Sequence, residues 1–215
     1  MGHEEIAPAD VPKPTIARLV LYLRELQQMS RGGILHVRSR ALAERLGLTD
    51  SQVRRDLSHL GQVGRRGVGY PVRELSGVIR TVLGTDRQWR VILIGAGNLG
   101  QALSGYKGFA EQGFELAGVF DSEPHKIGTV IHGHQVRAAV ELEAFVEGCG
   151  GIDMAIVAVP ASHACNVVSR LSELGVLGIL NFAPVSVRRQ SGDAIVLDVD
   201  LALELQRLAS HIVRR

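Results

Sequence analysis

The sequence predicts an α/β protein of two domains, a small helical domain with a β-hairpin followed by a doubly wound parallel sheet. Apolar residues recur at helical spacing in the first half, whereas apolar strand-like runs alternate with helical segments in the second. Residues 1–85 carry 13 Lys and Arg against 8 Asp and Glu, and residues 86–215 carry 11 against 14, so the halves differ in the sign of their net charge. With 215 residues, 46% of them hydrophobic, the chain can bury a core in each half.

The composition also indicates the cellular compartment in which the chain is expected. The chain has two cysteines, Cys149 and Cys165, which argue against a disulfide framework and suit a reducing compartment. It has no long uncharged apolar run, and its first ten residues are acidic and contain proline, unlike a signal peptide. We therefore expect a cytoplasmic protein without a membrane partner, beginning with an acidic flexible tail over residues 1–14.

Three helices are expected in the first domain. Thr15 follows two prolines and is expected to cap the first, whose inward positions are Ile16, Leu19, Val20, Leu23 and Leu26. A second helix over residues 39–46 ends at Gly47, which suits a left-handed cap. Thr49 and Gln52 have capping-box spacing, so a third helix is expected from about Asp50, with its apolar residues turned inward.

Two short helices joined by a tight glycine turn match the helix-turn-helix pattern. Residues 61–72 follow the second of these helices, contain four glycines and are expected to form a basic hairpin, as in a winged helix. Residues 11–85 carry 13 cations against 5 anions, and 12 of the 13 are arginines, which suit phosphates and guanine edges. Double-stranded DNA is the partner that this pattern favours, and an ordinary α+β domain with solvated arginines is the alternative.

The winged helix is assigned to residues 15–84, with a connecting helix over 74–83 and a boundary at 84–86. The expected DNA-binding residues lie on the second and third helices and on the wing: Ser39, Arg40, Ser51, Gln52, Arg54, Arg55, Ser58, Arg65, Arg66, Gly67 and Tyr70.

From Trp89 onward the pattern is that of a Rossmann-like domain, assigned to residues 86–198. Strands are expected over residues 91–94, 116–120, 154–159, 178–181 and 194–197. Helices are expected over residues 98–106, 140–147 and 163–174.

A glycine loop, Gly95, Ala96, Gly97, Asn98, Leu99 and Gly100, follows the first of these strands. A strand, glycine loop and helix in this order place backbone N–H groups where a pyrophosphate can bind. Asp121 ends the second strand, 24 residues after Gly97, where an acid binds ribose hydroxyls and repels a 2′-phosphate. NAD(H) is thus favoured over NADP(H), although His125 and Lys126 lie nearby.

Loops at the carboxyl ends of later strands are further candidates for contact with the cofactor, or are simply well-packed turns. They are Val159, Pro160 and Ala161 after one strand, and Asn181, Phe182, Ala183 and Pro184 after the next.

Catalytic and metal-binding patterns are poorly supported. His132 and His134 lack a further ligand at metal-like spacing, and no acid–base constellation is evident, so neither a metal nor an enzyme activity is expected. A dinucleotide fold without such a constellation favours a sensor. Two alternatives stay open, an NAD-dependent oxidoreductase with an N-terminal interaction domain and an interaction module that binds CoA or another nucleotide.

The last segment, residues 199–215, is expected to be a dimerisation helix. Leu201, Leu205, Leu208 and Ile212 form one apolar stripe, which either finishes the core or packs against a second subunit. A homodimer is expected because helix-turn-helix proteins commonly read two half-sites.

In combination these features closely resemble the Rex family of bacterial redox-sensing transcriptional repressors. The resemblance covers nearly all of residues 11–213, and its motifs are residues 51–58, 66–70, 95–100, 181–184 and 199–202. It implies a homodimer with winged helices, Rossmann domains that bind NADH or NAD+, and a C-terminal helix exchanged between subunits. It also implies that the repressor leaves its operator when NADH rises.

The resemblance further suggests Arg24, Tyr106 and Asp200 as an allosteric relay, with Tyr106 also near the cofactor. The chain departs from the family at His59, Leu60 and Val63, where aromatic residues are common, and at Asp198, where asparagine is common.

Overall fold

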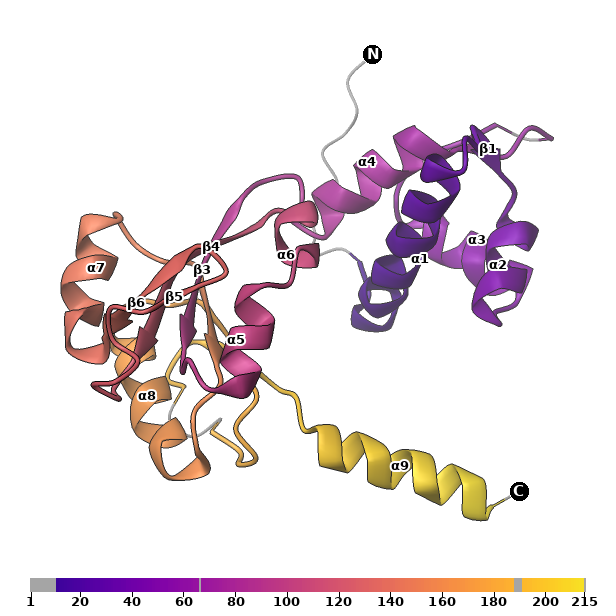
Figure 1. Ribbon diagram of the computed structural model, residues 1–215. Helices are drawn as coiled ribbons and strands as arrows, with labels where there is room; N and C mark the ends of the chain where they lie inside the picture. The colour runs from indigo at the N-terminus through magenta and orange to yellow at the C-terminus, as the bar shows by residue number, and fades with distance from the viewer. Residues whose placement is uncertain (1–10, 66, 188–190, 215) are drawn as a thin grey trace. The chain divides into compact units, whose positions relative to one another are not determined.

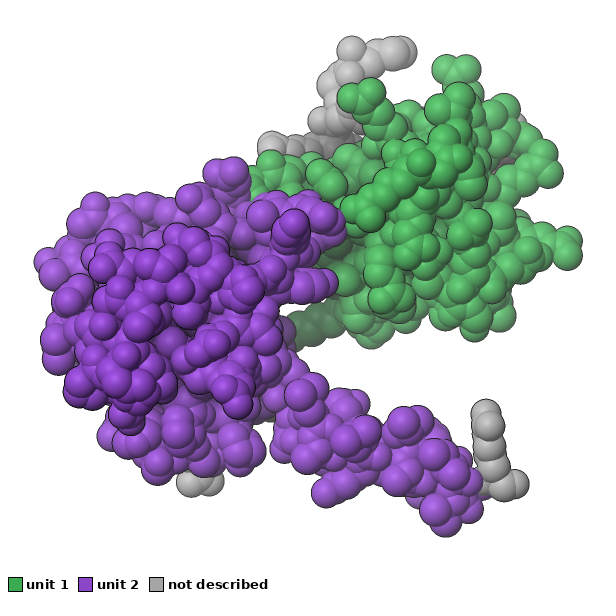
Figure 2. Space-filling view, viewed as in Figure 1, with its two compact units in different colours: residues 1–87 green, residues 88–215 purple. Residues whose placement is uncertain are grey.

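The computed structural model describes residues 11–65, 67–187 and 191–214 and divides the chain into two compact units. Unit 1 ends at Arg87 and unit 2 begins at Gln88. Figure 2 colours unit 1 green and unit 2 purple. Residues 1–10 of the expected tail and Arg66 of the expected wing lie outside the described residues. The expectation of a flexible tail is wrong for residues 11–14, because Val11 is buried and a helix begins at Lys13.

Unit 1 is mainly helical. Its helices are α1 (Lys13–Arg31), α2 (Ser39–Leu46), α3 (Asp50–Ser58) and α4 (Val72–Val82) (Figure 1). The strands β1 (His36–Val37) and β2 (Tyr70–Pro71) pair in antiparallel fashion. The helices bury one apolar core, whose largest fully buried side chains are Leu19, Tyr22, Leu26, Leu42, Leu60, Leu75 and Ile79.

Two predicted helix ends of unit 1 are confirmed, whereas α4 begins two residues before the expected range of 74–83. Gly47 adopts the expected left-handed conformation after α2, with φ 66°, and the Thr49 hydroxyl accepts a hydrogen bond from the Gln52 amide, 3.2 Å away. The expectations that Thr15 caps α1 and that Val20 faces the core are both wrong, since Val20 is 54% exposed. The helix begins earlier because Pro14 fits a first turn, where no N–H donor is needed, and Pro12 is the N-cap residue.

The expected hairpin over residues 61–72 is only partly right. Within its described residues, one isolated antiparallel bridge joins Arg65 and Gly69, and Tyr70 then pairs with Val37 of β1. Gly64 and Gly69 have φ angles of 99° and 102°, so the chain turns repeatedly instead of extending. At Gly69 a side chain would also collide with the Val37 carbonyl, so glycine permits this close approach to β1.

Unit 2 contains a seven-stranded sheet in the order β5-β6-β4-β3-β7-β8-β9, parallel except for the β5–β6 pair. The strands are β3 (Trp89–Ile94), β4 (Phe114–Asp121), β5 (Val130–Ile131), β6 (His134–Ala138), β7 (Met154–Val157), β8 (Gly178–Asn181) and β9 (Ile195–Asp198). All five expected strands are confirmed. The hairpin of β5 and β6 was not predicted, because its strands are short and mostly polar or exposed.

Helices cover the sheet unevenly. Beyond the short η2 (Ala139–Glu141), the helices of unit 2 are α5 (Asn98–Ser104), α6 (Gly108–Glu111), α7 (Leu142–Gly148), α8 (Ala161–Glu173) and α9 (Leu201–Val213). Figure 1 shows α7 and α8 on one side of the sheet and α5 and α6 on the other. The second side leaves an apolar groove of about 560 Å³ over β7, β8 and β9, which includes Ile195 (72% exposed) and Leu197 (63%). We call it the open sheet face.

No residue of α9 is buried among those described. Its apolar stripe, Leu201, Leu205, Leu208 and Ile212, is between 56% and 67% exposed. None of the described helices is long and apolar enough to cross a membrane.

Candidate functional sites

Unit 1 carries a basic groove of about 820 Å³ between the starts of α2 and α3 and the wing. Six of the expected DNA-binding residues line it: Ser39, Arg40, Arg54, Arg65, Gly67 and Tyr70. Arg38 and Asp50 also line it and were not predicted. Arg38 could have been predicted from its position immediately before α2, because the starts of α2 and α3 both face this groove.

Asp50 orders the floor of the groove. Its carboxylate accepts a hydrogen bond from Ser39 and forms an ion pair with Arg54 at 2.9 Å. Asp50 lies in the first turn of α3, where a negative charge is favoured by the helix dipole. The Arg54 side chain stays 61% exposed, so it is held in place while still accessible.

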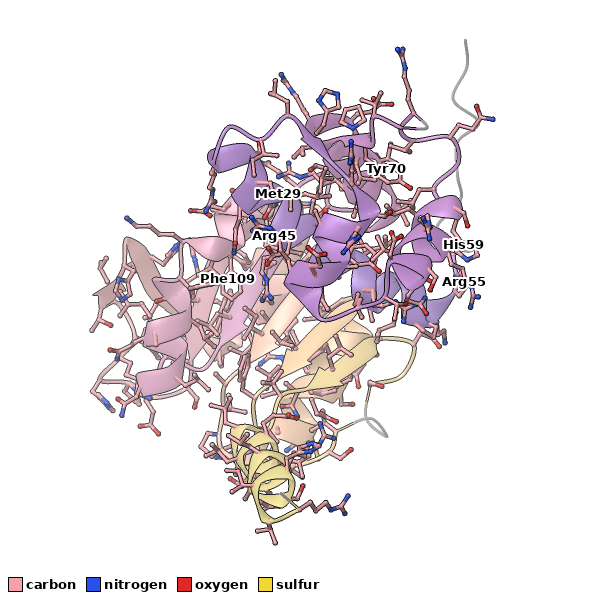
Figure 3. All side chains as sticks on the ribbon, turned by 90° about the vertical axis from the view of Figure 1, so that its right-hand side faces the viewer. Met29, Arg45, Arg55, His59, Tyr70 and Phe109 are labelled. Carbon is pink, nitrogen blue, oxygen red and sulfur yellow. The ribbon has the colours of Figure 1, made fainter. Side chains whose placement is uncertain are left out.

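A second exposed face of α3 carries Ser51, Arg55 and Ser58, which are three or four residues apart and therefore share one side of the helix. The Ser58 hydroxyl donates to the Arg55 carbonyl oxygen at 2.7 Å. Arg55 is labelled on this helix in Figure 3. These side chains are exposed to solvent, as expected of the recognition helix, the second helix of a helix-turn-helix motif, which enters the major groove and here is α3.

Beneath α3 lies a polar cluster centred on Asp56, which is fully buried. Its carboxylate accepts two hydrogen bonds from the Arg18 guanidinium, at 2.6 and 2.7 Å, and one from the Tyr22 hydroxyl at 2.6 Å. The Thr15 hydroxyl donates at 3.1 Å and the Gln52 side-chain amide at 3.0 Å. The cluster joins α3 to α1.

The charges of this cluster are mutually dependent. Burial alone would raise the pKa of Asp56, but the hydrogen bonds from Arg18, Tyr22, Gln52 and Thr15 lower the pKa to about 2. Burial raises the pKa of Tyr22, and its hydrogen bond to the Asp56 carboxylate raises it further. Asp56 is therefore ionised and Tyr22 neutral at physiological pH.

In unit 2 the glycine loop follows β3, and its last three residues form the first turn of α5. Gly95 has φ 104°, and a side chain there would collide with the Ala158 carbonyl, while one at Gly100 would collide with the Gly95 carbonyl. At Gly97, by contrast, no atom lies within 4 Å of the place that a Cβ would occupy. Gly95 and Gly100 thus permit the tight turn, whereas Gly97 leaves space beside the backbone.

Asp121 is 7% exposed and is bonded to this loop. It accepts hydrogen bonds from the Ala96 amide at 2.7 Å, the Glu123 amide at 2.8 Å and the Lys126 ammonium at 3.1 Å. Burial would raise the pKa of Asp121, but these donors outweigh it and lower the pKa below its ordinary value. The carboxylate therefore stabilises the glycine loop, a role that spacing alone did not reveal.

The other loops expected to contact a cofactor lie at the carboxyl ends of β7 and β8. Pro160 is the N-cap of α8, which begins at Ala161, and Val159 precedes them, half-buried. Asn181 is fully buried. Its amide group donates to the carbonyl oxygens of Ala183 and Val185 and to Asp198, and its oxygen accepts from the Ala183 amide, so it shapes the turn that contains Phe182 and Pro184.

The three expected relay residues lie on separate elements. Arg24 is exposed on α1, and Tyr106 follows α5, is 61% exposed and packs edge-on against Phe109. Asp200 is the N-cap of α9 and accepts hydrogen bonds from the amides of Ala202 and Leu203. Over residues 11–65, 67–187 and 191–214, no group of three or more His, Cys, Asp or Glu side chains is placed to hold a metal ion.

The structure shows the surroundings of the residues at which the sequence departs from the Rex family pattern. Leu60 is buried and Val63 half-buried in the core of unit 1, so aliphatic side chains fill the start of the wing. Asp198 accepts the hydrogen bond from Asn181 at 2.9 Å.

Comparison with known proteins gives consistent results for both halves. A family model described as a putative DNA-binding protein N-terminus matches residues 10–58, and a CoA binding domain model matches residues 86–185. The redox-sensing transcriptional repressor Rex of Thermotoga petrophila is 42% identical over 206 residues, covering 95% of this chain and 97% of that protein. The Rex protein of Rhodopirellula baltica is 44% identical over 207 residues, covering 96% and 86%.

Two solved structures are similar over nearly the whole chain. RSP in complex with β-NAD+ and operator DNA superposes with a TM-score of 0.87 and 35% identity, covering 94% of this chain and 92% of that one. RSP in complex with β-NADH superposes with a TM-score of 0.82 and 34% identity, covering 94% of each chain.

Proposed function

The chain belongs to the Rex family of redox-sensing transcriptional repressors, and we propose that it binds operator DNA as a homodimer and is released when NADH binds its Rossmann domain. The observation that carries the proposal is that one chain holds both an arginine-lined groove beside a recognition helix and a glycine loop with space beside its backbone. Because operators lie on the bacterial chromosome, the protein acts in the cytoplasm.

The DNA-binding surface is formed by the basic groove and the exposed face of α3. Arg54, Arg55 and Arg65 supply charge for phosphates or guanine edges, and Ser51 and Gln52 supply shorter polar groups at the start of the recognition helix. The proposed DNA-binding domain starts earlier than the expected residue 15, because Val11 is buried in the core of unit 1 and α1 begins at Lys13. Arg66 is also expected to contact DNA from the sequence and lies outside the described residues.

NADH or NAD+ is held by the glycine loop and by the loops after β7 and β8. Gly97 lets the pyrophosphate approach the backbone, since nothing lies within 4 Å of its Cβ position. When bound, the dinucleotide supplies the redox signal, because its nicotinamide ring is neutral in NADH and positively charged in NAD+. The residues of this chain bind and orient it, and we propose no hydride transfer.

Asp121 is proposed to act on the adenosine ribose in addition to stabilising the loop. Three donors occupy its two oxygens, which leaves one acceptor position for a ribose hydroxyl. We expect Asp121→Ala to weaken the binding of both cofactors and to reduce the ratio of NADH to NADPH affinity, measured by calorimetry. If both affinities fall by the same factor, Asp121 has only the loop-stabilising role.

The homodimer is proposed to form by exchange of α9. The exposed apolar stripe of α9 and the open sheet face are both uncovered within the described chain, and each matches the other in chemistry. Asp200 at the start of α9, together with Arg24 and Tyr106, is proposed to relay the state of the cofactor.

Release from DNA follows from a population shift between two dimer arrangements. Only one arrangement spaces the recognition helices for successive major grooves. NADH must bind the other arrangement more tightly, because a ligand with equal affinity for both shifts nothing.

The test is a titration of the operator complex with NADH at fixed salt concentration. We expect the complex to dissociate as NADH saturates, and undiminished binding at saturating NADH would refute the switch. Because a CoA binding domain model matches residues 86–185, calorimetry with NADH and with CoA is the companion measurement, and a preference for CoA would favour the nucleotide-binding module instead. Turnover of NADH with a panel of small substrates would favour the oxidoreductase.

A further inference from the structure

The side chain of Gln52 is held in one orientation by the Asp56 cluster. Its Nε2 lies 3.0 Å from Oδ1 of Asp56, one turn further along α3. Asp56 is fully buried and receives four other hydrogen bonds, all from α1, so it offers a fixed point to Gln52.

The two ends of the Gln52 amide are not interchangeable here. An ionised carboxylate only accepts hydrogen bonds, so it can be satisfied by the NH₂ end of Gln52 and not by its carbonyl oxygen. Burial works against ionisation of Asp56, but the Arg18 guanidinium donates two hydrogen bonds to its carboxylate and the Tyr22 hydroxyl donates one, which keeps it ionised. Nε2 therefore faces inward, and Oε1 faces away from Asp56.

An outward carbonyl oxygen has few partners on DNA. The phosphate oxygens, guanine O6 and N7, and thymine O4 only accept hydrogen bonds. In the major groove the donors are the N6 amino group of adenine and the N4 amino group of cytosine. The arginines nearby on α3 only donate hydrogen bonds, so they contact the acceptor groups of DNA instead.

We propose that Asp56 is a positioning residue that turns the carbonyl oxygen of Gln52 toward the operator, so that each recognition helix selects an amino-bearing base, adenine or cytosine, on the strand that Gln52 faces. This inference rests on the proposed function, since it requires that the α3 surface reads a specific sequence. It makes Gln52 a specificity-determining residue rather than a general contact to the backbone of DNA.

The experiment begins with the full-length protein without NADH and a library of duplex DNA whose central segment is randomised over two half-sites. Selection with the wild-type chain gives a consensus, and each position is then replaced in turn by the other three base pairs. At one position per half-site we expect adenine or cytosine on one strand to be favoured over guanine or thymine. The preference should be about fivefold to tenfold, as expected for one hydrogen bond to a base edge.

Gln52→Met keeps the length of the side chain and removes the amide. We expect this variant to lose the preference at that position and to keep it at all others. Gln28→Met is the matched control, because Gln28 is exposed on α1 away from the groove lining, and it should select the wild-type consensus. Circular dichroism and NADH affinity should be the same for all three proteins.

The contact itself is tested with a base analogue. Replacing the favoured adenine by purine, or the favoured cytosine by 2-pyrimidinone, removes only the amino group. We expect the wild-type chain to bind this duplex about fivefold to tenfold less tightly and Gln52→Met to bind it as well as the unmodified duplex.

The role of Asp56 is tested by Asp56→Asn in both backgrounds. If Asp56 acts through Gln52, the change weakens discrimination at this one position in the wild type and has no further effect on discrimination in Gln52→Met. A purely structural role would lower affinity for all duplexes alike in both backgrounds. If Asp56→Asn does not fold, the Gln52→Met and base-analogue results decide.

A consensus that Gln52→Met reads with unchanged preferences would overturn this inference and leave the proposed function standing. The same holds if the wild-type chain binds the amino-deleted duplex as tightly as the unmodified one. A wild-type chain that selects no consensus in the absence of NADH would overturn the proposed function and this inference with it.

Discussion

Removing the charge of Asp56 should destabilise unit 1 in a way that depends on pH. The pKa of Asp56 is lowered from its ordinary value of 3.8 to about 2 in the folded chain. That difference corresponds to about 2 kcal/mol of stability at neutral pH. Because the folded-state pKa is the lower one, this stabilisation is complete above about pH 5 and is lost as the pH falls toward 2.

We therefore expect Asp56→Asn to lower the free energy of unfolding of unit 1 by about 3 kcal/mol at pH 7, since it breaks a buried ion pair. The difference from the wild type should shrink by about 1 kcal/mol between pH 6 and pH 3. Urea unfolding followed by circular dichroism measures both units. Fluorescence of Trp89, the one tryptophan of the chain, reports unit 2 and should not change.

Asp86→Asn is the matched control, because Asp86 is an exposed aspartate of unit 1, and it should unfold as the wild type does. The reasoning would be refuted if the effect of Asp56→Asn were independent of pH over this range. It would also be refuted if the two substitutions were equally destabilising.

Three further outcomes are expected. Arg55→Ala should weaken operator binding and reduce its salt dependence by about one counterion while NADH affinity is kept, measured by binding titrations over a salt series, and loss of both affinities together would indicate misfolding instead. Gly100→Ala should lower the stability of unit 2 by about 1–3 kcal/mol in Trp89 fluorescence melts, because the alanine side chain has no space there. Gly97→Ala should fold normally and bind NADH less tightly. Equal melting temperatures of the two variants would contradict the assigned roles. Leu208→Glu should yield monomers in analytical ultracentrifugation, whereas Ser210→Glu on the opposite side of α9 should leave the dimer intact, and a dimeric Leu208→Glu would exclude the α9 stripe from the interface.

Local signals in the sequence were sufficient for most elements of the fold. Gly47 and the Thr49 cap act within one turn of the chain, so their residue types alone indicated where α2 ends and α3 begins. The apolar strands of the parallel sheet were equally visible, since both faces of the central strands are buried. The β5–β6 hairpin was missed because its short strands, mostly polar or exposed, resemble a loop.

The polar clusters could not be predicted in the same way. Asp56 is contacted by residues 34 to 41 positions earlier in the chain, and no pattern within α3 indicates that its carboxylate is buried. Similarly, the position of Asp121 predicted a ribose contact, whereas its bond to the Ala96 amide depends on how β4 and the glycine loop meet. Thr15 illustrates the cost of a purely local argument, since a residue chosen as a cap instead donates to Asp56.

The open sheet face affects the stability and the degradation of the protein in a cell. A newly made chain that has not met a partner exposes this groove and the α9 stripe together, which is the kind of apolar surface that promotes aggregation. If α9 of a second copy covers it, the stability of unit 2 depends on protein concentration, and the melting temperature should rise as the protein is concentrated. Unpaired chains would then be the ones that proteases remove, so the abundance of the repressor would be limited by assembly as well as by synthesis.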